Sequence, residues 1–160
     1  MAKIASRDDP YSKIAWGNLA RPADVEARLR RELETSIRRG EGTDALIDRI
    51  RRVTGFELYR AKRIAITERT ATVNGARLEA ILEENRNRKH GEKATRKQWV
   101  HSHYPKSPRH HHVAASGQVR YATEYFVMGN GARLLYPGDP NAPASERIHC
   151  RCYIRRVIGG

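Results

Sequence analysis

The sequence predicts an α+β fold in which amino-terminal helices, one of them long, pack with a small carboxy-terminal antiparallel sheet. In the first half of the chain, apolar residues recur every three or four positions, which is the period of a helix with one face against a core. In the second half, short segments that suit strands are separated by Gly, Pro, Ser or Asn. Helices followed by strands are typical of the α+β class.

Residues 21–85 are the predicted helical region. The first helix is expected to begin at Arg21-Pro22, because proline suits the first helical turn, and to end at Gly40. Thr43 is the predicted N-cap of a second, short helix, because a threonine hydroxyl can accept a hydrogen bond from a free amide of the first turn. That helix is expected to end before Thr54-Gly55.

A third helix is expected from Phe56 onward, and two interpretations of it stay open. It is either one long helix or two helices broken near Asn74-Gly75, since glycine lowers helix stability. Residues 1–20 precede the helical region without any sustained periodicity. They are predicted to form an extended arm that could dock on a partner.

Residues 86–98 are predicted to be a basic linker, because they carry one acid, Glu92, among many cations. Two roles stay open for it: a solvated tether, or a loop that contacts DNA or a partner protein. The candidate DNA-contacting residues are Arg86, Arg88, Lys89, Lys93, Arg96 and Lys97.

Residues 99–160 are the predicted β-rich region. Its strands are expected at or near Gln98–His101, Gln118–Tyr121, Tyr125–Met128, Arg133–Tyr136 and Tyr153–Val157. Before the last strand the spacing predicts a tight turn, in which Pro137 presets the first corner, Gly138 takes a positive φ and Asp139 accepts hydrogen bonds from backbone amides. This turn would position the final strand.

The composition indicates a polyanionic partner. The chain has 31 Lys and Arg against 18 Asp and Glu, a net charge of +13, which favours DNA through the release of counterions. No run approaches the roughly 20 apolar residues of a membrane span, and the amino terminus has no signal-peptide segment. We therefore expect a protein made and kept in a cytoplasm, with no membrane partner.

Two cysteines and several histidines suggest a metal site. Cys150 and Cys152 are one residue apart, a spacing that strains a mutual disulfide. Thiolate and imidazole are the ligands that structural zinc prefers, so Cys150, Cys152 and His112 could hold zinc. The fourth ligand would be His149, His110 or Asp139. The alternative is two small, reduced, buried cysteines at the edge of the terminal strand.

The sequence does not favour an enzyme. A metal-dependent nuclease needs carboxylates close to its histidines, and the nearest acids are isolated from one another along the chain, at Glu124, Asp139 and Glu146. A Ser-His-Asp elbow, a phosphate loop and an HExxH motif are all missing from the sequence. The competing hypothesis is a DNA-binding or nuclease-like effector that uses the basic surface and the histidine cluster.

Several motifs occur in an order that carries a resemblance. They are the helix segment Ala61–Glu68 with Asn74 downstream, Trp99, Arg109-x-x-His112 followed by Gly117, Tyr136-Pro137-Gly138-Asp139, and Cys150-Arg151-Cys152. Over roughly residues 54–154 this order resembles the Mu F-like phage head morphogenesis family. The match singles out His112 among its neighbouring histidines. The chain departs from the family pattern at His149, where an Asn is usual.

The resemblance implies a minor head protein of a tailed double-stranded DNA phage. Such proteins are virion components that lie near the portal inside the capsid and aid head assembly or DNA ejection. The implied partners are the portal protein, the packaged DNA and the major capsid protein. The family's substitution pattern also implies a metal site shared by the Arg-x-x-His and Cys-Arg-Cys motifs.

Overall fold

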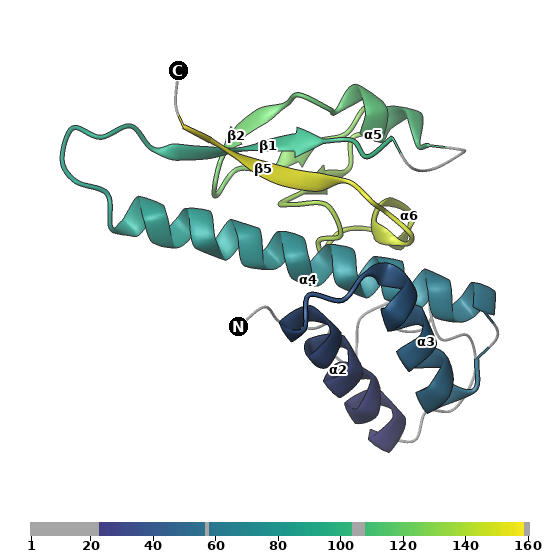
Figure 1. The fold of residues 1–160 in the computed structure, drawn as a ribbon. Coiled ribbons are helices and arrows are strands. Elements are labelled where there is room, and N and C mark those ends of the chain that lie inside the picture. Colours follow the sequence, from purple (N-terminus) through teal and green to yellow (C-terminus); the bar gives the residue numbers. More distant parts are fainter. Residues whose placement is uncertain (1–22, 57, 104–107, 159–160) are drawn as a thin grey trace.

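A computed structural model describes residues 23–56, 58–103 and 108–158 of the protein. The predicted arm over residues 1–20 lies outside these ranges. The elements form three layers (Figure 1). One long helix lies in the middle, with two shorter helices on one side of it and the strands on the other. This arrangement is the predicted α+β fold, with helices first and a small antiparallel sheet after them.

Both short helices end at or close to a glycine. Helix α2 spans Ala23–Arg38, and Gly40 follows it with a φ of 64°. Helix α3 spans Thr43–Thr54 and ends at Gly55, whose left-handed backbone lets its amide donate to the carbonyl of Arg51. The predicted N-cap was wrong by one residue. Gly42 is the N-cap and accepts the first helical hydrogen bond, so Thr43 already belongs to the helix.

Helix α4 spans Leu58–Arg86 without a break, so the first of the two interpretations is confirmed. Asn74 and Gly75 are both buried in its middle. The amide side chain of Asn74 donates to the carbonyls of Pro137 and Cys152 and accepts from the amide of Ile154. Tertiary contacts thus offset the low helix propensity of the Asn-Gly pair.

Helix α4 contributes to two separate hydrophobic clusters. Its first half packs against α2 and α3, with Ile64 buried among residues such as Leu33 and Leu46. Its second half packs under the strands, where Leu78 and Ile81 contact the cluster around the fully buried Trp99. Because the two halves bury different faces, α4 forms part of the core of both the helical layer and the strand layer.

No described helix is both long enough and apolar enough to cross a membrane.

All five predicted strands are confirmed. Strands β2 (Val119–Tyr121), β1 (Thr95–Val100) and β5 (Tyr153–Ile158) form an antiparallel sheet in that order, with Trp99 opposite Ile154. Strands β3 (Phe126–Val127) and β4 (Arg133–Leu134) form a separate pair. The short helices α5 (His110–Ala114) and α6 (Ala144–Arg147) were not predicted, because one helical turn is too short to show a period.

The end of the predicted linker belongs to the sheet. Strand β1 begins at Thr95, and its alternating burial turns Thr95, Lys97 and Trp99 inward. Lys97 has no exposed surface, and its Nζ donates to the carbonyls of Ala122 at 2.8 Å and Leu135 at 2.7 Å. The prediction that Lys97 contacts DNA is therefore wrong.

Candidate metal centre

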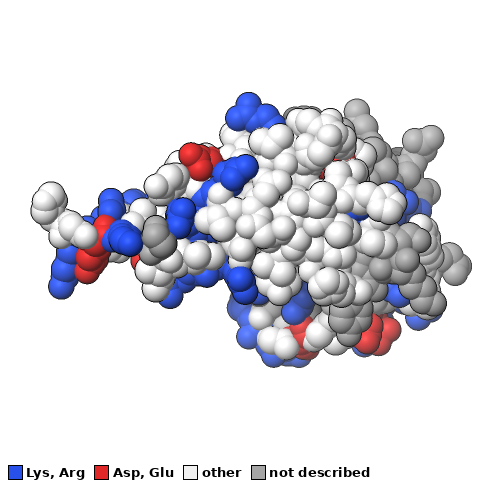
Figure 2. Space-filling view, turned by 90° about the horizontal axis from the view of Figure 1, so that it is seen from above, with Lys and Arg blue, Asp and Glu red and all other residues white. Residues whose placement is uncertain are grey.

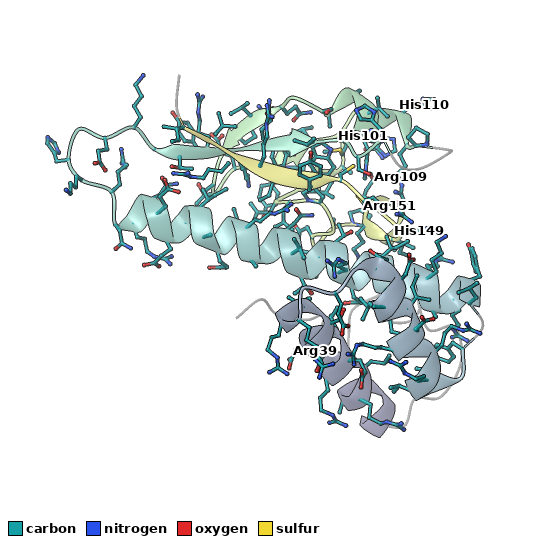
Figure 3. All side chains as sticks on the ribbon, viewed as in Figure 1. Arg39, His101, Arg109, His110, His149 and Arg151 are labelled. Atoms are coloured by element: carbon teal, nitrogen blue, oxygen red, sulfur yellow. The ribbon has the colours of Figure 1, made fainter. Side chains whose placement is uncertain are left out.

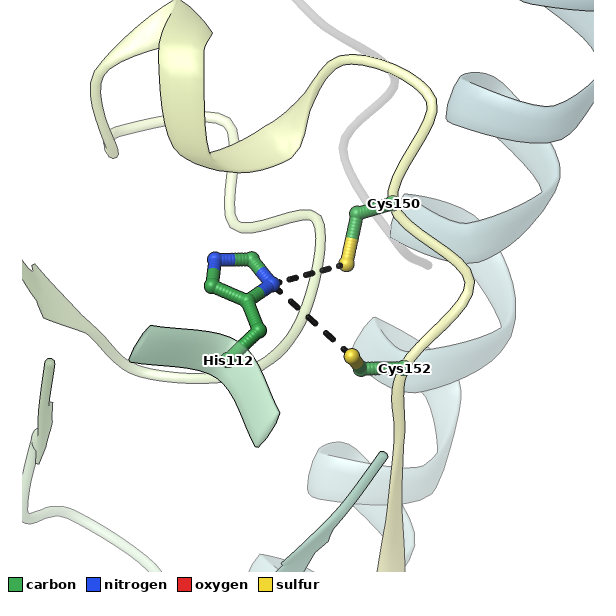
Figure 4. A group of neighbouring side chains, drawn as sticks. All are labelled: His112, Cys150 and Cys152. Atoms are coloured by element: carbon green, nitrogen blue, oxygen red, sulfur yellow. Dashed lines mark hydrogen bonds between the residues drawn. The ribbon is translucent and has the colours of Figure 1, made fainter. Parts of the chain in front are cut away.

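His112, Cys150 and Cys152 meet at one end of the sheet (Figure 4). His112 lies on α5, and the two cysteines lie on the segment that leads from α6 into β5. Nδ1 of His112 is 3.7 Å from Sγ of Cys150 and 3.8 Å from Sγ of Cys152. All three side chains are buried, and the three ligand atoms lie within 4.8 Å of one another. These residues were predicted to form a metal site, and the fold brings them together.

The two sulfur atoms are electrostatically different. The hydrogen bond from Cys150 lowers the pKa of Cys152 to about 5, and His112 lowers it further. Together these two contacts outweigh burial, which acts to raise the pKa. The same contact with Cys152, together with burial, raises the pKa of Cys150 well above its ordinary value. Cys152 is therefore the more acidic of the two thiols. Both cysteines are free of disulfides.

A buried carboxylate holds the opposite side of the His112 ring. Oε2 of Glu146 is 2.8 Å from Nε2 of His112 and 2.8 Å from Nε2 of His111, while Asn130 donates to Oε1 at 2.9 Å. Burial acts to raise the pKa of Glu146, but these hydrogen bonds outweigh it and the pKa is lowered. Glu146 is therefore an ionised anchor for the ring.

Sequence reasoning did not find this role for Glu146. It treated the residue as an isolated acid, 34 positions from His112. Only the placement of α6 beside α5 brings the two side chains into contact, and α6 itself was not predicted.

Aromatic rings close the inner side of the cluster. The ring of Trp99 meets the ring of His112 edge to face, with centroids 5.3 Å apart, and contacts Phe126 at the same separation. Both Trp99 and Phe126 are fully buried. This apolar wall excludes water behind the imidazole, so the open side of the cluster faces away from the core.

The open side borders a cavity of about 800 Å³. Figure 3 shows the basic and imidazole side chains of this end of the molecule, and His101, Arg109, His149 and Arg151 all line the cavity. His101 is 7% exposed, and its Nδ1 has no hydrogen-bond partner in the part of the chain that the structure describes. The cavity therefore gives an ion access to the cluster from this side.

Comparison with known proteins identifies a family. A family model described as Phage Mu protein F like protein matches residues 27–155. The chain belongs to this family. It is also 30% identical over 105 residues to a Bacillus subtilis (strain 168) protein named Uncharacterized protein YqbB, covering 64% of the chain and 32% of that relative. The chain therefore spans about a third of that relative's length. No solved structure matches.

Membership of the Mu F-like family supports the coarse assignment to bacteriophage head proteins, and the matched residues include the whole cluster. The three predicted candidates for a fourth ligand stay outside the group of adjacent ligand atoms. His110 and His149 are exposed, and Asp139 accepts from the amides of Leu135 and Asn141 within its turn. The prediction that one of them completes the site is not supported by this geometry.

His149 has a backbone conformation that few side chains adopt. His149 has a φ of 59°, in the left-handed region that Asn and His adopt more readily than most side chains. Its amide donates to Oγ1 of Thr67 at 2.8 Å, which fixes the chain just before Cys150. The position therefore orients the cysteine segment on α4.

The other family-motif residues lie outside the ligand cluster, and two of them bond to its surroundings. Arg109 donates to the carbonyl of Ile148 at 2.6 Å, linking α5 to the cysteine segment. Gly117 has a φ of 94° and donates to the carbonyl of Trp99. Glu68 is half-buried on α4 and is outside the ligand cluster.

The predicted turn is confirmed and has a second role. Gly138 has the expected positive φ of 83°, and Asp139 accepts the two amide hydrogen bonds given above. Pro137 is fully buried. A Cβ at Gly138 would lie 2.9 Å from the backbone nitrogen of Ala71, so glycine also permits the turn to pack directly on α4.

Proposed function

We propose that this chain is a minor head protein of a tailed double-stranded DNA phage, which lies near the portal inside the capsid and contacts packaged DNA. In that position it aids head assembly or DNA ejection. Membership of the Mu F-like family supports the head role. The observation that carries the DNA contact is the concentration of exposed cations where α4 turns into β1.

We define the basic tip as residues 86–93. Its cations are all exposed: Arg86, Arg88, Lys89 and Lys93. Figure 1 shows this connection at the end of α4 that lies away from α3, and Figure 2 shows it projecting from the body of the molecule with lysines and arginines along it. A projecting, exposed set of cations can approach phosphates without burying any other charge.

The tip has a defined shape. The guanidinium of Arg88 donates to the carbonyl of Glu92, and the amide of Lys89 donates to Oε2 of Glu92 at 3.0 Å. Arg86 pairs with Glu83 one turn earlier on α4. Glu92 thus bonds to the backbone of the tip and Glu83 to Arg86. Lys89 and Lys93 are exposed at the surface. Arg96 is half-buried in β1 and is a weaker candidate.

Removing charge from the basic tip is expected to reduce the salt dependence of DNA binding. In the variant Arg88→Gln/Lys89→Gln/Lys93→Gln, the slope of log Kobs against log salt should fall by up to about 2.7, because each lost phosphate contact contributes about 0.9. The measurement is a titration of the full chain with a random-sequence duplex at several salt concentrations.

The matched control removes three exposed arginines from the helical layer, in the variant Arg38→Gln/Arg51→Gln/Arg52→Gln. It has the same net charge as the tip variant and should keep most of the wild-type slope. Equal slopes for the two variants would mean that binding follows net charge alone and would contradict a contact through the tip.

The head role is tested in the particle. The protein should be present in purified virions and in DNA-free proheads, and it should cross-link to the portal protein more than to the major capsid protein. Mass spectrometry of the particles and of the cross-linked products makes both measurements. Its absence from washed particles would refute the proposal.

The competing proposal, a nuclease-like effector, gains support from the contact between Glu146 and two histidines. We nevertheless propose a non-enzymatic role, because Glu146 is 2% exposed and both its oxygens already accept hydrogen bonds. A carboxylate so buried and so fully hydrogen-bonded favours a structural role for Glu146. Plasmid DNA incubated with the protein and Mg²⁺, Mn²⁺ or Zn²⁺ should be retarded in a gel but not cut.

A further inference from the structure

We propose that His112, Cys150 and Cys152 bind one Zn²⁺ ion, and that Glu146 is the positioning residue that presents the His112 ring to it. The chemical class of the ligands favours zinc, since two sulfurs and one imidazole are typical of structural zinc sites. This site is independent of the DNA contact proposed above.

The distances match those of a zinc tetrahedron. With Zn–S near 2.3 Å, Zn–N near 2.0–2.1 Å and tetrahedral angles, a ligand nitrogen and a ligand sulfur should be about 3.6 Å apart. The separations from Nδ1 of His112 to the sulfurs of Cys150 and Cys152 are 3.7 and 3.8 Å. The nitrogen therefore already lies at the distance from each sulfur that a shared ion would require, and the two sulfurs are within 4.8 Å of each other.

Glu146 determines which nitrogen of His112 faces the sulfurs as an electron-pair donor. When Nε2 donates its proton to the carboxylate at 2.8 Å, Nδ1 carries the lone pair, and this lone pair is directed at the two cysteines. A carboxylate behind a ligand histidine is the usual outer shell of a zinc site. The rival grouping of His111, His112 and Glu146 would occupy Nε2 instead and leave both sulfurs unused.

The surroundings also suit a bound ion. The Trp99 and Phe126 rings close the inner side, and the cavity on the outer side provides an entry path and space for a water molecule as the fourth ligand. Zinc would link α5 to the segment before β5, and that segment is anchored to α4 by the hydrogen bond from Thr70 to the carbonyl of Cys150 at 2.7 Å. The ion would thus fasten three elements together.

The test uses the full chain, stripped of metal under reducing conditions and then titrated with Zn²⁺ and, separately, with Co²⁺. We expect one ion per chain, a rise in Tm with Zn²⁺, and a thiolate-to-cobalt charge-transfer band. Release of protons on binding should accompany the titration, because a thiol must ionise to become a ligand. A chain that takes up no metal with both thiols reduced, and whose Tm is unchanged by Zn²⁺, overturns the proposal.

Variants separate ligands from neighbours. His112→Gln, Cys150→Ser and Cys152→Ser should each abolish stoichiometric binding, whereas His110→Gln, an exposed neighbour on α5, should bind as the wild type does. If His110→Gln and His112→Gln bind with equal affinity, His112 is not a ligand and the proposal fails. If a cysteine variant does not fold, the thiolate-to-cobalt band of the wild type still shows whether sulfur binds the metal.

Glu146→Gln has its own expected signature. The affinity for Zn²⁺ should fall by about 10- to 100-fold while the thiolate-to-cobalt band persists, because the cysteines remain and only the support of the histidine is weakened. Unchanged affinity in a folded Glu146→Gln variant would overturn the positioning role.

Discussion

Replacing Asn74 with alanine is expected to lower the free energy of unfolding by about 4 kcal/mol. Asn74 is 2% exposed and joins three groups from two distant segments: the carbonyls of Pro137 and Cys152 and the amide of Ile154. Each of these buried backbone groups would lose its partner, at a cost of about 1–3 kcal/mol apiece that is not fully additive.

The measurement is urea or thermal unfolding of the full chain, in which a loss of this size lowers Tm by about 10 °C. Glu79→Ala, an exposed substitution five residues further along α4, is the control and should have little effect. Amide exchange should accelerate most in β5. If Asn74→Ala and Glu79→Ala have the same free energy of unfolding and the same Tm, the Asn74 contacts do not hold β5 on α4.

Replacing Lys97 with methionine should destabilise the protein by about 2 kcal/mol at pH 7. Methionine fills similar space but leaves the carbonyls of Ala122 and Leu135 without their donor. The loss of the ammonium contact with the Phe126 ring, at 5.2 Å from its centroid, acts in the same direction. Lys93→Met, on the exposed tip, is the matched control.

The difference in the free energy of unfolding between wild type and Lys97→Met should grow as the pH rises. Burial lowers the pKa of Lys97 to about 8, from 10.5, although Asp139 and Glu124 oppose the shift. Between these two values the unfolded chain binds one more proton than the folded chain, so a rise in pH favours folding. From pH 7.5 to 9.5 the wild type should gain about 2 kcal/mol relative to Lys97→Met.

This range ends below the titration of Tyr136, whose pKa burial raises to about 12 and which both proteins share. Denaturant unfolding at four or five pH values makes the comparison. If the difference between wild type and Lys97→Met stays constant across the range, Lys97 does not titrate below its ordinary pKa in the folded state.

Much of the fold followed from local patterns. The five strands and the ends of α2 and α3 lie where glycines, prolines and short apolar runs placed them, because these signals act within a few residues. The turn at Gly138 was predicted for the same reason, since its φ and its hydrogen bonds to Asp139 are set within five positions.

Other features depended on contacts between distant segments. Lys97 lies in a basic segment whose composition is typical of a linker. It is buried only because β1 pairs with both β2 and β5. The continuity of α4 through Asn74-Gly75 depends on partners 63 to 80 positions away. Local propensity carries no information on such partners.

The sequence by itself determined the class of fold, the order of its longer helices and its strands, the family and the three candidate zinc ligands, because each of these follows from local spacing or from an ordered set of motifs. Only the tertiary structure decided that Glu146 stands behind His112 and that His110, His149 and Asp139 stand apart from the sulfurs. Those outcomes depend on how α5, α6 and the approach to β5 converge on α4. Side chains far apart in sequence meet there, and their burial sets both their hydrogen bonds and their charge.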